Sequence, residues 1–211
     1  MKTDDLIDLL AQDIAPGWPF RTLFVAAALL AVTLAGMVFF ASIGARADID
    51  HAVKTSRFLF KFVVTIPLAV GAVGLAMTMA CPGAELGNWR WVLAVSPGLL
   101  LGAAALEMGQ LPPVAWTANM IGHNANLCLT LIPLLSLGPL ICFIGVLRHG
   151  APTRPGMTGA AAGLAAAAIA ATFYAANCDD DSPLFVLLWY PLALMMVSAV
   201  GYGLGQRYLR W

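Results

Sequence analysis

The sequence predicts an all-α, polytopic membrane protein with six transmembrane helices and with both termini in the cytoplasm. Of its 211 residues, 61% are hydrophobic and 10% are charged, whereas a soluble domain carries about 25% charged residues. Six apolar stretches are close to the roughly 20 residues that a helix needs to cross a bilayer. They lack the alternation of barrel strands, and in lipid only helices or closed barrels satisfy their own backbone.

The expected spans follow each other closely. In order they are Thr22–Ile43, Phe60–Ala80, Trp91–Leu106, Leu127–Leu147, Thr158–Ala176 and Pro183–Leu204. The third is the shortest. Between the third and the fourth, Pro112-Pro113 and Trp116 fit either a short interfacial helix or an irregular loop. Lys61 lies near a span end and is expected to extend outward, so no ionisable side chain is expected deep in a span.

Glycine pairs mark the last two spans. Gly159 and Gly163 begin the fifth span, and Gly201 and Gly205 end the sixth. Small residues at this spacing let two helix backbones approach closely. We therefore expect these glycines to pack the two helices against each other within one chain.

The orientation follows from the excess of Lys and Arg on the cytoplasmic side. With the N-terminus inside, seven basic residues lie inside: Lys2, Arg21, Arg90, Arg148, Arg154, Arg207 and Arg210. Four lie outside: Arg46, Lys54, Arg57 and Lys61. The first loop is thus more basic than an external loop should be, while the later loops agree with the assignment.

Residues 1–21 form a cytoplasmic N-terminal segment ahead of the membrane domain, residues 22–211. This segment opens with Met-Lys-Thr-Asp-Asp and has no apolar centre, so it is not a signal peptide. Helical spacing places an apolar stripe on one side of residues 3–14. The stripe comprises Leu6, Leu9, Leu10 and Ile14, with Ile7 at its edge, while Asp4, Asp5, Asp8 and Asp13 lie mainly opposite.

This short acidic helix is marginal alone in water and requires a surface for its stripe. A helix that lies on an anionic membrane is normally basic. A basic groove on a partner protein therefore fits better, and packing against the protein's own cytoplasmic loops is the alternative. The net charge of zero argues against direct nucleic acid binding, which needs a basic surface.

Four cysteines suggest chemistry at the other membrane face. Cys81 falls at the cytoplasmic end of a span and Cys142 in mid-span, whereas Cys128 and Cys178 fall at external span ends. An oxidising periplasm permits a disulfide there. Three interpretations stand side by side: a structural disulfide, a redox- or metal-sensitive pair, and two unrelated thiols. His123 could join Cys128 and Cys178 at a soft-metal site.

Several motifs together resemble the NrsF family of membrane anti-sigma factors. The most specific is Asn177–Tyr190 (NCDDDSPLFVLLWY), and the resemblance extends over essentially the whole chain. Further matches are Gly150–Pro155, the opening Asp-Asp-Leu-Ile-Asp-x-Leu, Gly122-His123 ahead of Cys128, and the closing Arg210-Trp211.

The resemblance implies a non-enzymatic regulator in the inner membrane of a Gram-negative bacterium. Its partners would be an extracytoplasmic-function sigma factor and the lipid bilayer. Cys128 and Cys178 correspond to the family's periplasmic cysteines, which respond to heavy-metal or oxidative stress. The sigma-binding segment corresponds to about Thr3–Ile14, with Asp4, Asp5, Leu6, Ile7, Leu9, Leu10 and Ile14 as its contacts. No permanent cofactor is expected, only a transient heavy-metal ion at the cysteines.

Two rival functions come from other classes. A membrane thiol-disulfide oxidoreductase linked to quinone would usually need Cys-x-x-Cys and a second pair, and this chain has neither. A small metal exporter would need ligands at mid-depth, where the sequence offers only Cys142. The chain also lacks a phosphate loop, His-Glu-x-x-His and a serine-nucleophile elbow.

Overall fold

The computed structural model describes residues 18–83 and 87–210. The expected N-terminal helix, with Asp4, Asp5, Leu6, Ile7, Leu9, Leu10 and Ile14, lies outside these residues. The long helices are α2 (Phe20–Ser42), α4 (Ser56–Met79), α5 (Trp89–Gln110), α7 (Ala125–Leu147), α8 (Pro155–Tyr174) and α9 (Pro183–Tyr208). Two short ones are α3 (Ile49–Ala52) and α6 (Pro113–Ile121). Within the described ranges no strand occurs, which confirms the all-α class.

The six expected spans are confirmed, with small shifts at their ends. Six candidate spans are long and apolar enough to cross a membrane, and the fourth joins α6 to α7. α4 begins four residues before the expected Phe60 and α5 ends four residues after Leu106, so both take in polar residues assigned to loops. The sequence left either a short helix or an irregular loop after Pro112, and the structure has the helix, α6. The indole N–H of Trp116 donates to the carbonyls of Met108 and Leu111.

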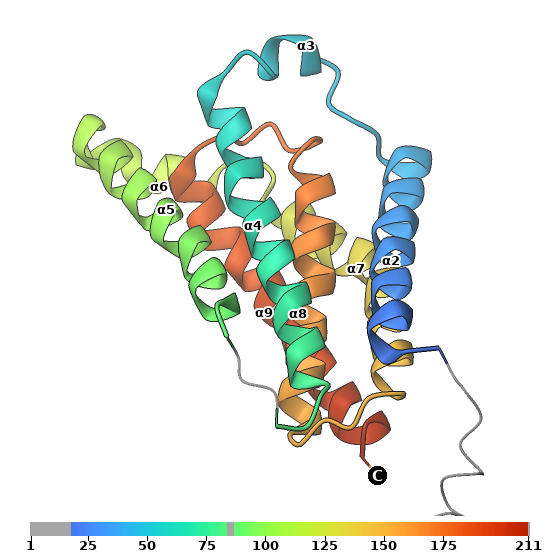
Figure 1. The fold of residues 1–211 in the computed structure, drawn as a ribbon. Helices are drawn as coiled ribbons and strands as arrows, with labels where there is room; N and C mark the ends of the chain where they lie inside the picture. Colours follow the sequence, from blue (N-terminus) through green and yellow to red (C-terminus); the bar gives the residue numbers. More distant parts are fainter. Residues whose placement is uncertain (1–17, 84–86, 211) are drawn as a thin grey trace, which may run out of the picture.

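α8 lies at the centre of the bundle. It packs against α9, α4 and α7, while α2 packs on α7 and α5 packs on α4 and α9 (Figure 1). Its sequence, PGMTGAAAGLAAAAIAATFY, consists mostly of small residues, and most of them are fully buried. Small side chains bring the neighbouring helices close, so a helix of modest hydropathy becomes the core element.

The expected glycine contact joins α8 to α9. A Cβ on Gly159 would collide with the carbonyl oxygen of Gly201, and one on Gly163 would lie 2.6 Å from the oxygen of Val197. The reverse also holds, because a Cβ on Gly201 would meet the backbone of Gly159. Each glycine therefore faces bare backbone of the other helix, as expected for an intramolecular contact.

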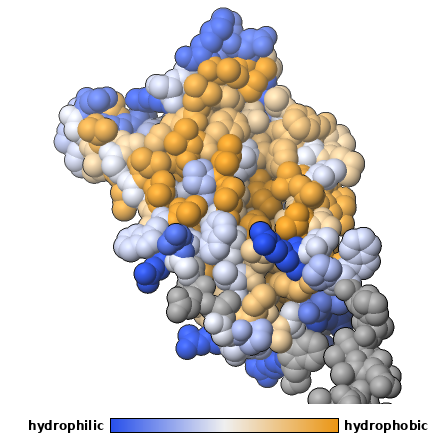
Figure 2. Space-filling view, in the orientation of Figure 1, coloured by the Kyte–Doolittle hydropathy of each residue, from blue (hydrophilic) through white to orange (hydrophobic). Residues whose placement is uncertain are grey.

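The bundle has two polar ends and an apolar middle. α3, α6 and the α8–α9 connection lie at one end, the upper end in Figure 1. The start of α2 and the C-terminal end of α9 lie at the other end. Figure 2 shows hydrophobic surface across the middle and hydrophilic surface towards both ends. We call the end with α3 and α6 the α3/α6 end.

The expectation for Lys61 is wrong. Its side chain is 0% exposed and points into the bundle from the second turn of α4. Glu107, assigned to a loop, lies inside α5 and is 4% exposed. Sequence position predicted the depth of both residues but not the side of the helix on which they lie. Lys61 is paired with Asp181 and Glu107 with Arg57.

Candidate functional site

The two cysteines at the α3/α6 end are the centre of the candidate site. Cys128 lies in the first turn of α7 and Cys178 follows the last turn of α8, where its N–H donates to the carbonyl of Tyr174 at 3.0 Å. Both are free thiols, 0% and 1% exposed, within one buried cluster that also contains Tyr174 and Tyr190. Cys81 is exposed and Cys142 half-buried.

Burial limits the reactivity of the Cys178 thiol. Desolvation raises its pKa above the ordinary value of 9.0, and the positive charge of Lys61 opposes this increase. The Sγ atom lies 3.8 Å from the carbonyl oxygen of Asp180. Because the thiolate is the reactive form, the raised pKa of Cys178 disfavours its reaction while the thiol stays buried.

Lys61 holds the segment between α8 and α9 that contains Cys178 and Asp181. Its amine donates to the carbonyl oxygen of Cys178 at 2.7 Å and lies 2.6 Å from Oδ1 of Asp181. It also lies 5.4 Å from the centre of the Phe58 ring. A buried ammonium without partners would be very costly, so Lys61 holds Cys178 and Asp181 in place.

Arg46 ties the α2–α4 connection to the same carboxylate. Its Nη1 donates to Oδ2 of Asp181 at 3.0 Å, and its backbone N–H donates to the carbonyl of Ala176. The guanidinium also forms two hydrogen bonds with Asp48, of 2.5 and 2.7 Å, and thereby lowers the pKa of that carboxyl. Two cations from separate elements thus converge on Asp181.

Asp180 holds the turn between α6 and α7. Its Oδ2 accepts from the backbone N–H groups of His123 and Asn124, each at 2.8 Å. Asn124 also donates to Asp179. The turn depends on Gly122, which has φ 58°, a region that favours glycine; a Cβ there would lie 2.5 Å from the Phe185 ring. Cys128, in the first turn of α7, donates its N–H to the carbonyl of Asn124 at 2.8 Å.

Glu107 connects the same segment to α5. Its Oε2 accepts from the Ser182 hydroxyl at 2.7 Å and from the N–H of Leu184 at 3.2 Å. Its Oε1 lies 3.1 Å from Nη1 of Arg57, at the start of α4. Ser182 itself caps α9 by accepting from Leu184.

The Cys178–Ser182 segment is therefore bonded to four parts of the α3/α6 end: the α2–α4 connection, α4, α5 and the α6–α7 turn. These pairs also explain the basic first loop, because Arg46, Arg57 and Lys61 are each paired with a carboxylate. Lys61 and Glu107 were missed as site residues. Their one sequence signal was a charge next to an apolar run.

The structure places His123 apart from the buried thiols. Its side chain is 94% exposed, and its Nδ1 lies 3.7 Å from Oδ1 of Asp180. It lines a polar cavity of about 410 Å³ together with Arg57 and Asp179. Within residues 18–83 and 87–210, no group of three or more His, Cys, Asp or Glu side chains is arranged to hold a metal ion.

The chain is similar along its whole length to proteins named as anti-sigma factors. A family model described as "Negative regulator of sigma F", NrsF, matches residues 10–211. The "Anti-sigma-F factor NrsF" of Caulobacter vibrioides is 32% identical over 216 residues, and the "Probable anti-sigma-F factor NrsF" of Azospira oryzae is 31% identical. Both alignments cover 100% of this chain and of the relative. No solved structure matches.

The six-helix fold and these relatives define the class as a multi-pass membrane protein with a regulatory role in transcription. The chain belongs to the NrsF family of anti-sigma factors. This confirms the family resemblance drawn from Asn177–Tyr190 and the shorter motifs.

Proposed function

We propose that this protein holds an extracytoplasmic-function sigma factor inactive at the cytoplasmic face of a bacterial inner membrane. The family match over residues 10–211 carries this proposal. The contact would be the N-terminal segment, whose stripe of Leu6, Leu9 and Leu10 would dock on the sigma factor. Its acidic residues suit a protein that is basic where it meets DNA and polymerase.

Release would begin at Cys128 and Cys178, facing the periplasm. A heavy-metal ion on the thiolates, or a change between thiols and disulfide, would alter the Cys178–Ser182 segment. That segment is bonded to four surrounding parts of the bundle, so a change in it would be passed to several helices. A tenfold loss of sigma affinity needs only about 1.4 kcal/mol of differential binding. The start of α2, to which the N-terminal segment is joined, lies at the opposite end from the thiols.

The partner part of the proposal is tested by replacing Leu6 and Leu10 with Asp. Two charges on the stripe should abolish co-purification of the sigma factor, since a buried unpaired carboxylate costs several kcal/mol. Gln12→Asp is the matched control, because it adds a carboxylate to the polar side of the expected helix. Undiminished sigma binding by the Leu6→Asp/Leu10→Asp variant would exclude the docking helix.

The sensing part is tested in the same strain with Cys128→Ser, Cys178→Ser and the double variant. Induction of the sigma regulon by heavy metal or oxidant should disappear in all three, while Cys81→Ser, at an exposed thiol, should respond normally. Membrane abundance of each variant is measured alongside, so that loss of the protein is told apart from loss of sensing. Normal induction in all three cysteine variants would refute the sensor.

A further inference from the structure

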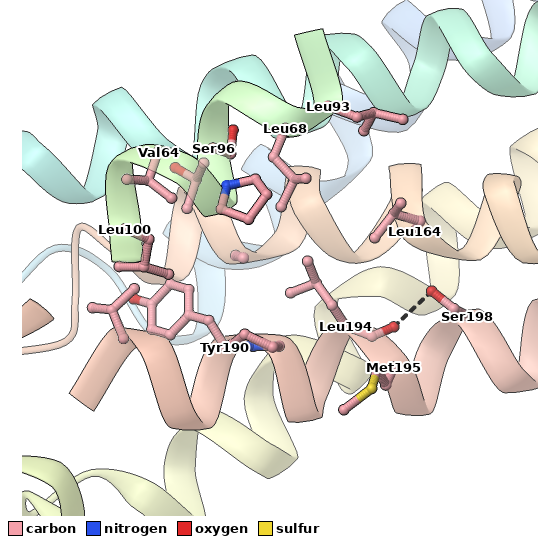
Figure 3. Close-up of a pocket in the computed structure, with 15 residues that line it drawn as sticks. Val64, Leu68, Leu93, Ser96, Leu100, Leu164, Tyr190, Leu194, Met195 and Ser198 are labelled. Atoms are coloured by element: carbon pink, nitrogen blue, oxygen red, sulfur yellow. Dashed lines mark hydrogen bonds between the residues drawn. The ribbon is translucent and has the colours of Figure 1, made fainter. Parts of the chain in front are cut away.

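A cavity in the apolar middle of the bundle is lined by hydroxyl groups that form no hydrogen bond with the described residues. It lies between α4, α5, α8 and α9 and has a volume of about 310 Å³ (Figure 3). Most of its lining is aliphatic, including Leu68, Leu100 and Leu194. This volume is at the small end of the range of ligand pockets, about 300–1,000 Å³.

Three hydroxyl groups of the lining have no hydrogen-bond partner in the described part of the chain: those of Thr65, Ser96 and Tyr190. The three side chains are 2%, 1% and 4% exposed. In Figure 3, Ser96 and Tyr190 lie at the same end of the cavity as Val64 and Leu100. Each lies about two turns or more from the ends of its helix, at a depth where water is scarce and an unpaired hydroxyl is costly.

The hydroxyls of Thr65 and Ser96 differ from most Ser and Thr hydroxyls of the helices, and the one other buried hydroxyl without a partner in the described residues, that of Tyr174, does not line the cavity. Helical Ser and Thr usually donate to a carbonyl one turn earlier, and eight do so here: Thr33, Ser42, Thr78, Thr130, Ser136, Thr158, Thr172 and Ser198. Ser198 lines the same cavity and donates to Leu194. Thr65, Ser96 and Tyr190 therefore have donors available for a group that enters the cavity.

A proline follows each of the three hydroxyl-bearing residues within two positions. Pro67 follows Thr65 by two residues, and Pro97 and Pro191 directly follow Ser96 and Tyr190. A proline inside a helix removes a backbone hydrogen bond and bends the helix. Pro97 and Pro191 themselves line the cavity, so the interruptions in the backbone bonding of α5 and α9 lie beside it.

The cavity borders the surface that faces lipid. Pro97 and Met195 line it and are exposed, Met195 by 58%. A molecule dissolved in the bilayer can thus enter sideways, without crossing a polar end of the bundle. Its polar oxygens would reach the hydroxyls while an apolar tail stayed in lipid beside Met195.

We propose that this cavity binds the ring of a membrane quinone, whose carbonyl oxygens accept hydrogen bonds from Thr65, Ser96 and Tyr190. A quinone combines a flat apolar ring, acceptor oxygens and an isoprenoid tail, which match the apolar walls, the three donors and the opening to lipid. The acyl chain of a phospholipid would leave all three hydroxyls unpaired. The proposal does not depend on which sigma factor the protein holds.

The test is a calorimetric titration of the full-length protein in detergent with decylubiquinone, with empty micelles as reference. Saturable binding at one site is expected. Each of the near-isosteric changes Thr65→Val, Ser96→Ala and Tyr190→Phe should weaken binding roughly fivefold, the effect of one lost hydrogen bond. Ser198→Ala is the matched control and should bind like the wild type, because its hydroxyl is already bonded within α9.

A heat of decylubiquinone binding no greater than that of empty micelles would overturn the proposal. So would unchanged binding by the triple variant, or equal binding of decanol, which would identify an acyl-chain groove. A second measurement tests the site even if the hydroxyl variants fail to fold. In it, Ser96→Cys is labelled with N-ethylmaleimide in a Cys81→Ser background. Decylubiquinone should slow the labelling of position 96 at least fivefold, and an unchanged rate would contradict the site.

Discussion

Asp181→Asn should destabilise the membrane domain by about 3–5 kcal/mol, because it leaves a buried ammonium without its counter-charge. Lys61 is 0% exposed and lies 2.6 Å from Asp181. The amide that replaces the carboxylate has no charge to offset the desolvation of the amine. The melting temperature of the purified protein in detergent measures the effect.

A charge-free replacement separates loss of charge balance from loss of packing. Lys61→Met together with Asp181→Leu should recover most of the stability, since apolar side chains of similar volume can replace a buried ion pair at little cost and Arg46 keeps its pair with Asp48. Asp179→Asn is the control, because Asp179 is exposed and, among the described residues, is hydrogen-bonded only to Asn124. Its effect should stay within about 0.5 kcal/mol.

Asp181→Asn should also expose the Cys178 thiol. Without its counter-charge, the Lys61 ammonium is expected to turn toward water and leave the carbonyl of Cys178, so that the Cys178–Ser182 segment loses its attachment to α4. Maleimide labelling of Cys178 should then become faster in Asp181→Asn than in Asp179→Asn. A stable Asp181→Asn protein with an unreactive Cys178 would show that Lys61 does not hold the segment.

Gly201→Ala should destabilise the contact between α8 and α9 by about 3 kcal/mol, at the upper end of what overpacking costs in a core. The added methyl group would collide with the carbonyl oxygen of Gly159 and lie 3.0 Å from the Cα of Gly163. Backbone atoms cannot turn aside as a side chain can, so the two helices must separate.

Gly203→Ala provides a matched control on the same helix. A Cβ at Gly203 meets nothing within 4 Å, and alanine is a better helix former than glycine. Thermal unfolding of the two purified variants in detergent compares them directly. If Gly201→Ala melts at the temperature of Gly203→Ala, the close α8–α9 approach is not a source of stability.

Hydropathy was sufficient to predict the six spans, because roughly 20 apolar residues in sequence have one common solution in lipid. The glycine contact was also predictable, since the spacing of Gly159 and Gly163 repeats in Gly201 and Gly205. The position of Cys128 and Cys178 at one end of the bundle followed from the alternation of the spans. Their sidedness in the membrane and their role as sensors stay predictions.

The bonding around the thiols could not be predicted. Lys61 meets the carbonyl of Cys178 across 117 residues of sequence, and no local pattern specifies such a pair. Hydropathy places Lys61 near a span boundary, where a long side chain usually reaches water. Whether it does depends on which side of α4 meets α8, and that is decided by the packing of small residues elsewhere.

The distance in sequence between Lys61 and its partners bears on how this protein is made. During translation, α4 with Lys61 is made long before Asp181. The newly inserted second span therefore carries the Lys61 charge without this partner. A chain that stops short of the α8–α9 connection would lack Cys178 and Asp181 and would leave the Lys61 ammonium without these two partners. The second span can therefore reach its final bonding only after translation has passed the fifth.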